Sequence, residues 1–396
     1  MFNVSAGETD VLKEIRKILP EIAAAAPDTE KNRSLSADLI DRLGAAGMFR
    51  MMLPRSYGGE ELDFVQSMRV AEELAYADMS AGWTIMVTCG LNLNLGQFVP
   101  ETIDEVLADG PDVRLRGVTA PKGRFTEVEG GYRLTGRWAM ASGSFEPDWV
   151  VAAGFIYDGE KPRVMNGVAT WRLAVVKADK ATFLDTWKTV GLCGTASHDF
   201  VLEDVFVPSH HVAPMFGPSH IEAPAYRVPA SIGNTAHHAG VRIGCARAAL
   251  DELAALAVTK YSSFDPTRIL AEEPRFQSRF GELLTRVDAA KSYAETVMGE
   301  LWRIACTDRE AAPTDLARSR CMLAHVSREC AEIVTEAFRL GSSSSVYADS
   351  SLQRRLRDIQ VAAQHAAANS GAFETLGCAY VAEKVRARSN VPLRAA

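Results

Sequence analysis

The chain has 396 residues, and 43 basic and 50 acidic side chains give it a formal net charge of −7. With 47% hydrophobic and 23% charged residues, the composition is that of a soluble globular protein and excludes disordered, collagen-like and disulfide-scaffold classes. Charge of this mixed and slightly acidic kind argues against a general electrostatic attraction to nucleic acid. Seven scattered cysteines without a CxxC pair favour the reducing cytoplasm, and neither a signal peptide nor a membrane span is predicted.

The first 110 residues read as helices. Apolar spacing predicts helices at 11–22, 37–48, 64–76 and 82–98. Pro20 is expected to interrupt the first of them, and Ser36 is a plausible N-cap of the second. The fourth stretch carries no charge, so we expect it to be buried.

The pattern changes near Pro111 from helical to alternating. Short β-rich runs separated by Gly, Asp and Pro predict strands at 113–120, 131–140, 148–157, 171–178 and 198–207. Tyr132, Leu134 and Gly136 alternate with the polar Arg133, Thr135 and Arg137, as in a sheet with one buried face. This shift of period marks a domain boundary.

After a Pro- and His-rich connection, the chain is again helical. Helices are predicted at 231–260, 272–307, 313–340 and 350–377, which suits a four-helix bundle. The predicted fold class is therefore α+β, in three domains: an N-terminal helical domain at 1–110, a middle β-domain at 111–215 and a C-terminal helical bundle at 225–396.

Four local motifs carry a resemblance to a known family. They are LPRSYGGEELDF at 53–64, GGYRLTGRWAMASG at 130–143, GLCGTASHDFVLEDVFVP at 191–208 and LQRRLRDIQVAAQH at 352–365. In this order and spacing they resemble the acyl-CoA dehydrogenase superfamily over nearly the whole chain. The resemblance implies that superfamily's fold.

Finer details resemble one branch, the reduced-flavin-dependent monooxygenases (group D) that form the oxygenase component of two-component hydroxylases. GRWAMASG followed by Trp149, and DTWKTVGLCGTAS at 185–197, are similar to that branch. The alternative is an acyl-CoA dehydrogenase with FAD-linked α,β-desaturation. Its catalytic glutamate is expected near His365, but residues 360–373 contain no carboxylate. A third reading is a flavin or acyl carrier that has kept the fold and lost the chemistry.

The monooxygenase resemblance implies FADH₂ or FMNH₂ as cofactor, O₂ as co-substrate and a C4a-hydroperoxide as oxygenating species. It implies His365 and Ser142 as catalytic residues, with the histidine as the titratable group. Asp358 and His365 are seven residues apart and would share one face of a helix. The alternative interpretations are a bundle histidine bonded to a backbone carbonyl and an ordinary turn serine.

Several residues are expected to line the flavin. By resemblance, the cofactor-binding candidates are Thr119, Trp138, Ala141, Ser142, Thr195, Ser197 and Arg357. Each has a structural alternative. Trp138 would fill the core of the sheet, the hydroxyls would belong to a β-turn, and Arg357 would lie on a solvated, ion-paired helix face.

Asn92 and Asn94 are expected to bind the substrate, because the resemblance places their helix at the wall of the pocket. Their amides would suit an amine, a sugar or a carbonyl, whereas phenol-hydroxylating members carry histidines there; the alternative is that they hold a loop or helix in place. Aromatic hydroxylation, oxidation of an amine or amino sugar, and sulfur oxidation all remain open. A separate NAD(P)H–flavin reductase and a homotetramer are implied.

No metal site is predicted. Adjacent histidines such as His210–His211 and His237–His238 diverge on a helix or strand, and no flanking cysteine or carboxylate completes a ligand set.

Overall fold

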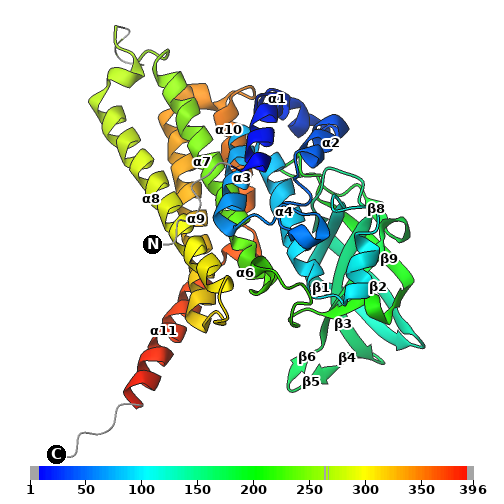
Figure 1. The fold of residues 1–396 in the computed structure, drawn as a ribbon. Coiled ribbons are helices and arrows are strands. Elements are labelled where there is room, and N and C mark those ends of the chain that lie inside the picture. Colours follow the sequence, from blue (N-terminus) through cyan, green and yellow to red (C-terminus); the bar gives the residue numbers. More distant parts are fainter. Residues whose placement is uncertain (1–8, 263–264, 266, 390–396) are drawn as a thin grey trace, which may run out of the picture. The chain divides into compact units, whose positions relative to one another are not determined.

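The computed structural model describes residues 9–262, 265 and 267–389. These residues form two compact units that divide between Cys245 and Ala246. Helices occupy the first part of the chain, strands the middle, and helices the remainder (Figure 1). Within the described residues, no helix combines the length and the apolar character needed to cross a bilayer.

The first unit begins with five helices: α1 (Asp10–Asn32), α2 (Ala37–Ala45), α3 (Phe64–Ala77), α4 (Met79–Leu95) and α5 (Pro100–Val106). Ser36 caps α2 by accepting a hydrogen bond from the Leu39 amide at 3.3 Å, as predicted. The expected break at Pro20 is wrong, since α1 runs through it. Proline removes one helical hydrogen bond, and burial of Ile18 and Ile22 on either side keeps the helix intact.

An eight-stranded sheet follows, and it confirms the five predicted strands. Its main strands are β1 (Leu115–Val128), β2 (Gly131–Ala141), β3 (Trp149–Asp158), β7 (Trp171–Lys177), β8 (Thr182–Leu184), β9 (His198–Pro208) and β10 (Val212–Pro214). Their order is β10-β7-β3-β1-β2-β9-β8, with the short β4 (Lys161–Pro162) on β3; β5 (Val164–Met165) and β6 (Val168–Ala169) form a separate ribbon. All pairs are antiparallel except β1 with β3. Along β2, Leu134 and Trp138 are buried in the core of the sheet and Tyr132 and Gly136 are partly buried, whereas the residues between them are exposed, as the sequence indicates.

Helix α4 confirms the prediction of a buried, uncharged helix. Of its 17 residues, nearly all are buried, and its N-cap Asp78 accepts a hydrogen bond from the Ala81 amide at 3.0 Å. Helix α7 (Thr235–Ala257) begins in the first unit. Gly90 of α4 packs closely there, because a Cβ at this position would meet the Asn234 amide at 2.5 Å.

The second unit contains the rest of α7 with α8 (Pro274–Ala305), α9 (Pro313–Leu340), α10 (Ser351–Ala363) and α11 (Gly371–Ser389). Helix α9 packs against α8, α10 and α11. The predicted helix over 350–377 is wrong, because α10 ends at Ala363 and a short 3₁₀ turn, η7 (Ala366–Ala368), separates it from α11. Asn369 starts the new helix by accepting a hydrogen bond from the Gly371 amide at 2.7 Å.

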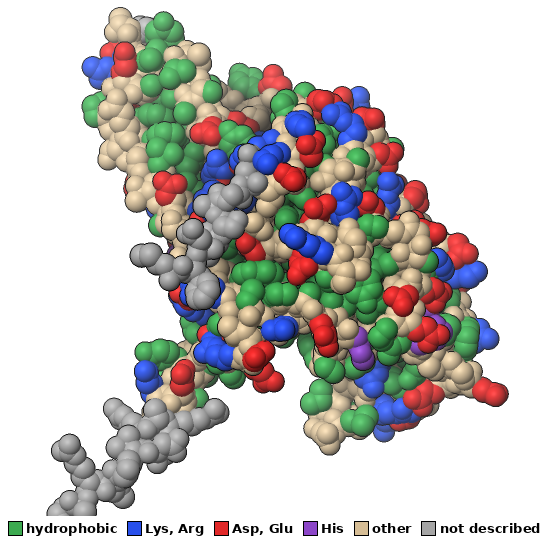
Figure 2. Space-filling view, in the orientation of Figure 1, with side chains coloured by type: hydrophobic (Ala, Val, Ile, Leu, Met, Phe, Trp, Pro, Cys, Tyr) green, Lys and Arg blue, Asp and Glu red, His purple; other side chains and the backbone are tan. Residues whose placement is uncertain are grey.

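Acidic and basic side chains are interspersed over the described part of the face seen in Figure 2. Many charged side chains of the described residues form ion pairs, for example Arg163 with Glu127 and Asp158. This mixed surface agrees with the low net charge of the sequence.

Candidate active site

A chain of hydroxyl groups lies where β2 ends and β9 begins. Ser142 Oγ and Ser197 Oγ are 2.6 Å apart, Ser197 Oγ and Thr195 Oγ1 are 2.6 Å apart, and Thr195 Oγ1 donates to the Leu192 carbonyl at 2.8 Å. From helix α4, the indole N–H of Trp83 donates to Ser142 Oγ at 3.2 Å. All three hydroxyl residues are buried. The structure thus brings together Ser142, Thr195 and Ser197, three of the residues that the sequence singled out.

The hydroxyl protons in this chain run in one direction. Each hydroxyl has a single hydrogen to donate. Because Thr195 donates to a carbonyl, it accepts from Ser197, and Ser197 has then no hydrogen for Ser142. Ser142 therefore donates to Ser197 and accepts from Trp83. Its second lone pair makes it an acceptor toward any further partner.

The backbone at this site is irregular. Between the β2–β9 pairs Trp138–Phe200 and Ala141–His198, strand β2 has one residue more than β9, which is a β-bulge. Met140 in this bulge has φ +63° and is 67% exposed. Leu192 and Ala196, in the loop before β9, also have positive φ values, of +50° and +46°. Such conformations cost about 1 kcal/mol each and concentrate at ligand sites.

Arg116 holds the two irregular segments together. Its guanidinium donates to the Ala141 carbonyl at 2.8 Å and to the Ala196 carbonyl, and it lies 4.5 Å from the centroid of the Phe183 ring. Burial lowers the pKa of Arg116 to about 10, so it remains charged at neutral pH. Ala141, a predicted flavin contact, thus bonds through its carbonyl to a residue that sequence reasoning missed.

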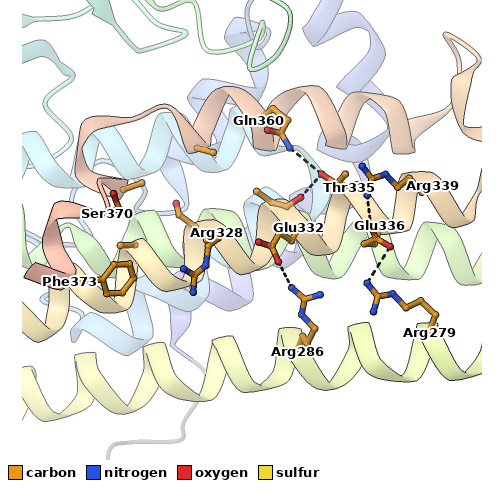
Figure 3. A pocket seen from close by; sticks show the side chains of 15 residues that line it. Arg279, Arg286, Arg328, Glu332, Thr335, Glu336, Arg339, Gln360, Ser370 and Phe373 are labelled. Carbon is orange, nitrogen blue, oxygen red and sulfur yellow. Dashed lines mark hydrogen bonds and ion pairs between the residues drawn. The ribbon is translucent and has the colours of Figure 1, made fainter.

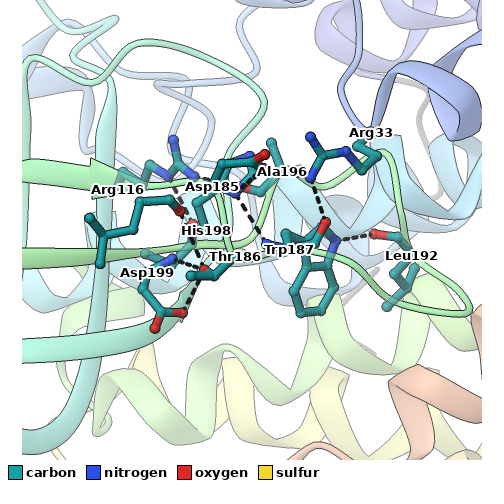
Figure 4. A network of polar contacts seen from close by, with 11 residues as sticks. Arg33, Arg116, Asp185, Thr186, Trp187, Leu192, Ala196, His198 and Asp199 are labelled. Carbon is teal, nitrogen blue, oxygen red and sulfur yellow. Dashed lines mark hydrogen bonds and ion pairs between the residues drawn. The ribbon is translucent and has the colours of Figure 1, made fainter.

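The loop between β8 and β9, which carries Thr195 and Ser197, is fixed at its other end (Figure 4). Arg33 binds the carboxylate of Asp185 at 2.6 Å and the carbonyl of Trp187 at 3.0 Å, and the Trp187 indole donates to the Leu192 carbonyl at 3.0 Å. Burial, together with the nearby charge of Arg116, lowers the pKa of His198 at the start of β9. These contacts hold the hydroxyl chain in a defined position.

Trp83, which bonds to the hydroxyl chain, also contacts polar side chains of helix α7. Its ring meets the His238 ring edge-on at 5.8 Å, and the Arg242 guanidinium lies 5.7 Å from its centroid. His237, one residue earlier, is fully buried, with Nδ1 2.9 Å from the Asn234 side-chain oxygen. No sequence motif marks Trp83 or Arg116, because an apolar helix and a strand arginine are common features.

Two of the other predicted residues of this unit, Trp138 and Thr119, lie on strands of the sheet. Trp138 is completely buried, donates its indole N–H to the Ala153 carbonyl at 2.7 Å and stacks on Phe200 at 4.9 Å, which is the core role given as its alternative. Thr119 is half-buried on β1, within the stretch where the β1–β3 register shifts.

Asn92 and Asn94 also bind the main chain. The Asn92 amide donates to the Phe49 carbonyl, and the Asn94 amide donates to the Gly90 carbonyl at 2.7 Å. Both side chains are buried. These contacts are those of the structural alternative, in which the amides hold a loop and a helix in place.

In the second unit, His365 lies just after α10 and is exposed. The expected shared helical face with Asp358 is wrong, because α10 ends at Ala363 and His365 has an extended backbone, with φ −66° and ψ +135°. His365 caps η7 instead, and its Nδ1 accepts a hydrogen bond from the Ala367 amide at 3.2 Å. The neutral imidazole therefore carries its proton on Nε2.

A pocket of about 620 Å³ lies beside this segment in the same unit (Figure 3). Ala363, Ala368 and Phe373 line it, together with side chains of α8 and α9. The arginines in it are largely held by carboxylates: Arg279 binds Glu336, and Arg286 binds Glu332. Arg357, a predicted cofactor-binding residue, is outside this lining and donates to the Gln353 side-chain oxygen at 2.7 Å.

Known families match most of this architecture. The model of the acyl-CoA dehydrogenase N-terminal domain matches residues 6–101, and that of the C-terminal domain matches residues 236–370. The solved structure of XiaF from Streptomyces sp., in complex with FADH₂ and glycerol, has a TM-score of 0.88 and 26% identity, covering 94% of this chain and 95% of that one. The fold is that of the acyl-CoA dehydrogenases, as the sequence motifs imply.

Curated relatives define the branch. An indole-3-acetate monooxygenase from Acinetobacter baumannii is 32% identical over 355 residues, covering 89% of each chain. The oxygenase component of an FADH₂-dependent resorcinol hydroxylase from Rhizobium sp. is 31% identical over 280 residues, covering 67% of each. The chain belongs to the flavin-dependent monooxygenases of the acyl-CoA dehydrogenase superfamily. It is an oxidoreductase that uses reduced flavin and O₂ to oxygenate a small organic molecule, rather than the acyl-CoA dehydrogenase of the alternative.

The hydroxyl chain fits such a cofactor. The edge of a flavin ring offers ring nitrogens and carbonyl oxygens, which are partners for neutral hydroxyl and indole groups. The reduced flavin, when bound, supplies the electrons that activate O₂. Ser142, Thr195 and Ser197 would supply hydrogen bonds to it.

Proposed function

We propose that this enzyme oxygenates a planar aromatic substrate, with an indole derivative as the first candidate. The relative from Acinetobacter baumannii, similar along 89% of the chain, is an indole-3-acetate monooxygenase, and the relative from Rhizobium sp. is a resorcinol hydroxylase. Two aromatic substrates on related chains favour an aromatic substrate here.

The character of α4 is the observation that supports this substrate class. If α4 walls the pocket, its polar groups should recognise a polar substrate. The amide nitrogens of Asn92 and Asn94 instead donate to main-chain carbonyls, as do the hydroxyls of Thr84 and Thr88, and most other side chains of this buried helix are apolar. The Asn92 side-chain oxygen is buried without a hydrogen-bond partner and leaves one acceptor on the helix. A wall of this kind favours a flat apolar ring over a sugar or an amine, because a buried polar group without a partner costs about 1–3 kcal/mol.

Ser142 is proposed as the residue that selects reduced flavin. Reduced flavin carries a hydrogen on N5, whereas oxidised flavin presents a bare nitrogen there. The directed chain from Trp83 through Ser142 and Ser197 to Thr195 makes Ser142 an acceptor. An acceptor matches N5–H and repels the lone pair of oxidised N5, so Ser142 holds the form of the cofactor that reacts with O₂. Thr195, Ser197, Ala141 and Thr119 would support the ring beside it.

His365 is proposed as the titratable catalytic group. The bond from the Ala367 amide to Nδ1 fixes the neutral tautomer with its proton on Nε2. An imidazole of this kind can hold a proton near the substrate oxygen and return it at neutral pH. Arg357, on the preceding helix, is retained as a candidate for the flavin phosphate, because a guanidinium is always charged and matches the geometry of a phosphate group.

Two partners belong to the proposal. One is a separate NAD(P)H–flavin reductase, because the Rhizobium relative is an oxygenase component. The other is further copies of this chain, in a homotetramer. Helix α11 exposes Phe373, Tyr380 and Val381, at 41%, 56% and 60%, on positions seven and eight residues apart. Such a stripe on a helix is a common site of subunit contact.

The decisive experiment supplies the purified enzyme with reduced flavin from a generic reductase under ¹⁸O₂. Indole-3-acetate, resorcinol, an amino sugar and a thioether are offered separately. We expect one atom of ¹⁸O in an aromatic product, and no product with NADH when the reductase is omitted. Light scattering after gel filtration measures the subunit number.

Two outcomes would overturn the proposal. Labelled product from the amino sugar or thioether, with none from either aromatic compound, would refute the substrate class. Anaerobic bleaching of bound oxidised FAD by an acyl-CoA would refute the oxygenase function itself.

A further inference from the structure

Three potential metal ligands converge where helix α5 meets the turn after strand β9. His211 Nε2 lies 2.7 Å from Glu105 Oε2, and His210 Nε2 lies 3.7 Å from the same oxygen. One ligand atom from each of the three residues lies within 4.8 Å of the others. Among the residues that the structure describes, no other group of this kind meets that spacing.

This geometry differs from the sequence expectation that adjacent histidines diverge. His210 and His211 lie on a 3₁₀ turn, η3 (Ser209–His211), and their ring centroids are only 4.4 Å apart at an angle of 73°. The carboxylate that the neighbouring sequence lacks comes from Glu105 on α5, which is distant in the chain. The fold therefore brings together three potential ligands that no local sequence motif predicts.

The surroundings hold these ligands in position. Thr102, one turn before Glu105 on α5, donates its hydroxyl to the His210 carbonyl at 2.6 Å. The His211 ring meets the buried ring of Trp149 edge-on at 5.6 Å. The side chains of His210 and Glu105 remain 33% and 46% exposed, so an ion and a water ligand have access from solvent. Pre-organised ligands with an open side are the requirements of a metal site.

We propose that Glu105, His210 and His211 bind a zinc-class divalent cation. Two imidazole nitrogens and one carboxylate oxygen form a His₂Glu set, and water completes a tetrahedron. Ligand atoms around Zn²⁺ lie about 3.3 Å apart, since Zn–N and Zn–O bonds are about 2.0–2.2 Å. The present separations require shifts of about 1 Å. Cu²⁺ and Ni²⁺ suit the same ligands and would compete.

The site would be structural. It would fasten α5, the last helix before the sheet, to the turn that leaves β9. The ion would replace the present contact between Glu105 and His211, and binding would stabilise the fold by mass action. None of the three residues belongs to the hydroxyl chain, so oxygenation does not depend on the ion.

Zn²⁺ titration of tag-free, metal-stripped protein against a chromophoric chelator tests the proposal. We expect about one Zn²⁺ per chain, and at least about tenfold weaker binding in His210→Ala and in Glu105→Gln. His220→Ala removes an exposed histidine outside the cluster and is the matched control, with unchanged binding. X-ray absorption should show two imidazole ligands on the bound ion.

Thermal unfolding separates binding at this site from adventitious binding. Zn²⁺ should raise the unfolding temperature of wild type and His220→Ala, and leave that of His210→Ala and Glu105→Gln unchanged. Absence of stoichiometric binding to the folded wild type would overturn the proposal. Equal affinity and equal stabilisation in all four proteins would overturn it as well. His210 and Glu105 are partly exposed, and circular dichroism checks that their variants fold.

Discussion

Trp83 donates its indole N–H to the hydroxyl of Ser142 at 3.2 Å, and this bond joins helix α4 to the end of strand β2. It agrees with the direction that the Thr195 bond to the Leu192 carbonyl gives the hydroxyl chain, in which Ser142 donates to Ser197 and accepts from the indole. A residue of the helical segment thereby supplies a hydrogen-bond donor to a residue at the edge of the sheet.

Replacing Ser142 by alanine should reduce discrimination between the two forms of the flavin. Loss of one acceptor costs about 1 kcal/mol, so we expect the affinity for reduced flavin to fall about five- to tenfold and that for oxidised flavin to change little. Anaerobic titration with dithionite-reduced flavin and aerobic titration with oxidised flavin measure the two constants. An equal loss in both would refute the selective role of Ser142.

Trp83→Phe should remove the hydrogen bond to Ser142 while keeping an aromatic ring in the same space. We expect a smaller loss of selectivity for reduced flavin than in Ser142→Ala, with about 1 kcal/mol less stability. Trp171→Phe is the control, because the Trp171 indole nitrogen is buried with no hydrogen-bond partner. If the two tryptophan variants bind both flavins alike, the hydroxyl chain does not depend on Trp83.

Arg116→Met should destabilise the fold around the site. The substitution leaves the carbonyls of Ala141 and Ala196 without their donor, and we expect the free energy of unfolding to fall by about 2–4 kcal/mol. Arg116→Lys should recover only part of this, since an ammonium cannot form the same fork. Urea denaturation measures the loss, and the exposed Arg133→Met should lose less than about 0.5 kcal/mol.

His237 should make stability fall in acid. Burial lowers its pKa from 6.5 to about 3, so the unfolded chain takes up a proton that the folded chain refuses. This contribution is fully present above pH 6.5 and is lost as the pH falls toward 3, by about 1.4 kcal/mol per pH unit. Urea unfolding of wild type and His237→Gln at pH 7.0 and 5.0 measures it. The same pH dependence in both proteins would contradict the assignment.

His365→Asn separates the chemical role of His365 from its role as a cap. Asparagine is also a good N-cap, so it should accept the Ala367 amide hydrogen bond and preserve η7. It cannot titrate, and we expect coupled product formation to fall by about a hundredfold and to lose its pH dependence near neutrality. Unchanged product yield and pH profile, with intact flavin binding, would exclude His365 from catalysis.

Local patterns in the sequence determined the elements. Alternation predicted the strands, the uncharged run from Gly82 predicted a buried helix, and Ser36 predicted a cap; all of these depend on neighbours within a few residues. The motif around Ser142 and the GLCGTAS segment likewise supplied three hydroxyl residues that the fold brings together. The helix predicted through His365 failed, because Asn369 starts a new helix there.

Only the tertiary structure decided what those residues contact. The burial of Arg116, the donor from Trp83 and the meeting of Glu105 with His211 each join residues far apart in the chain. Asn92 and Asn94, chosen as substrate contacts, turned out to bind carbonyls that no pattern locates. Side-chain types and the local hydrophobic period can be read directly from the sequence. The hydrogen-bond partner of a buried polar group depends instead on how distant segments pack, and this packing is determined by burial of the whole core.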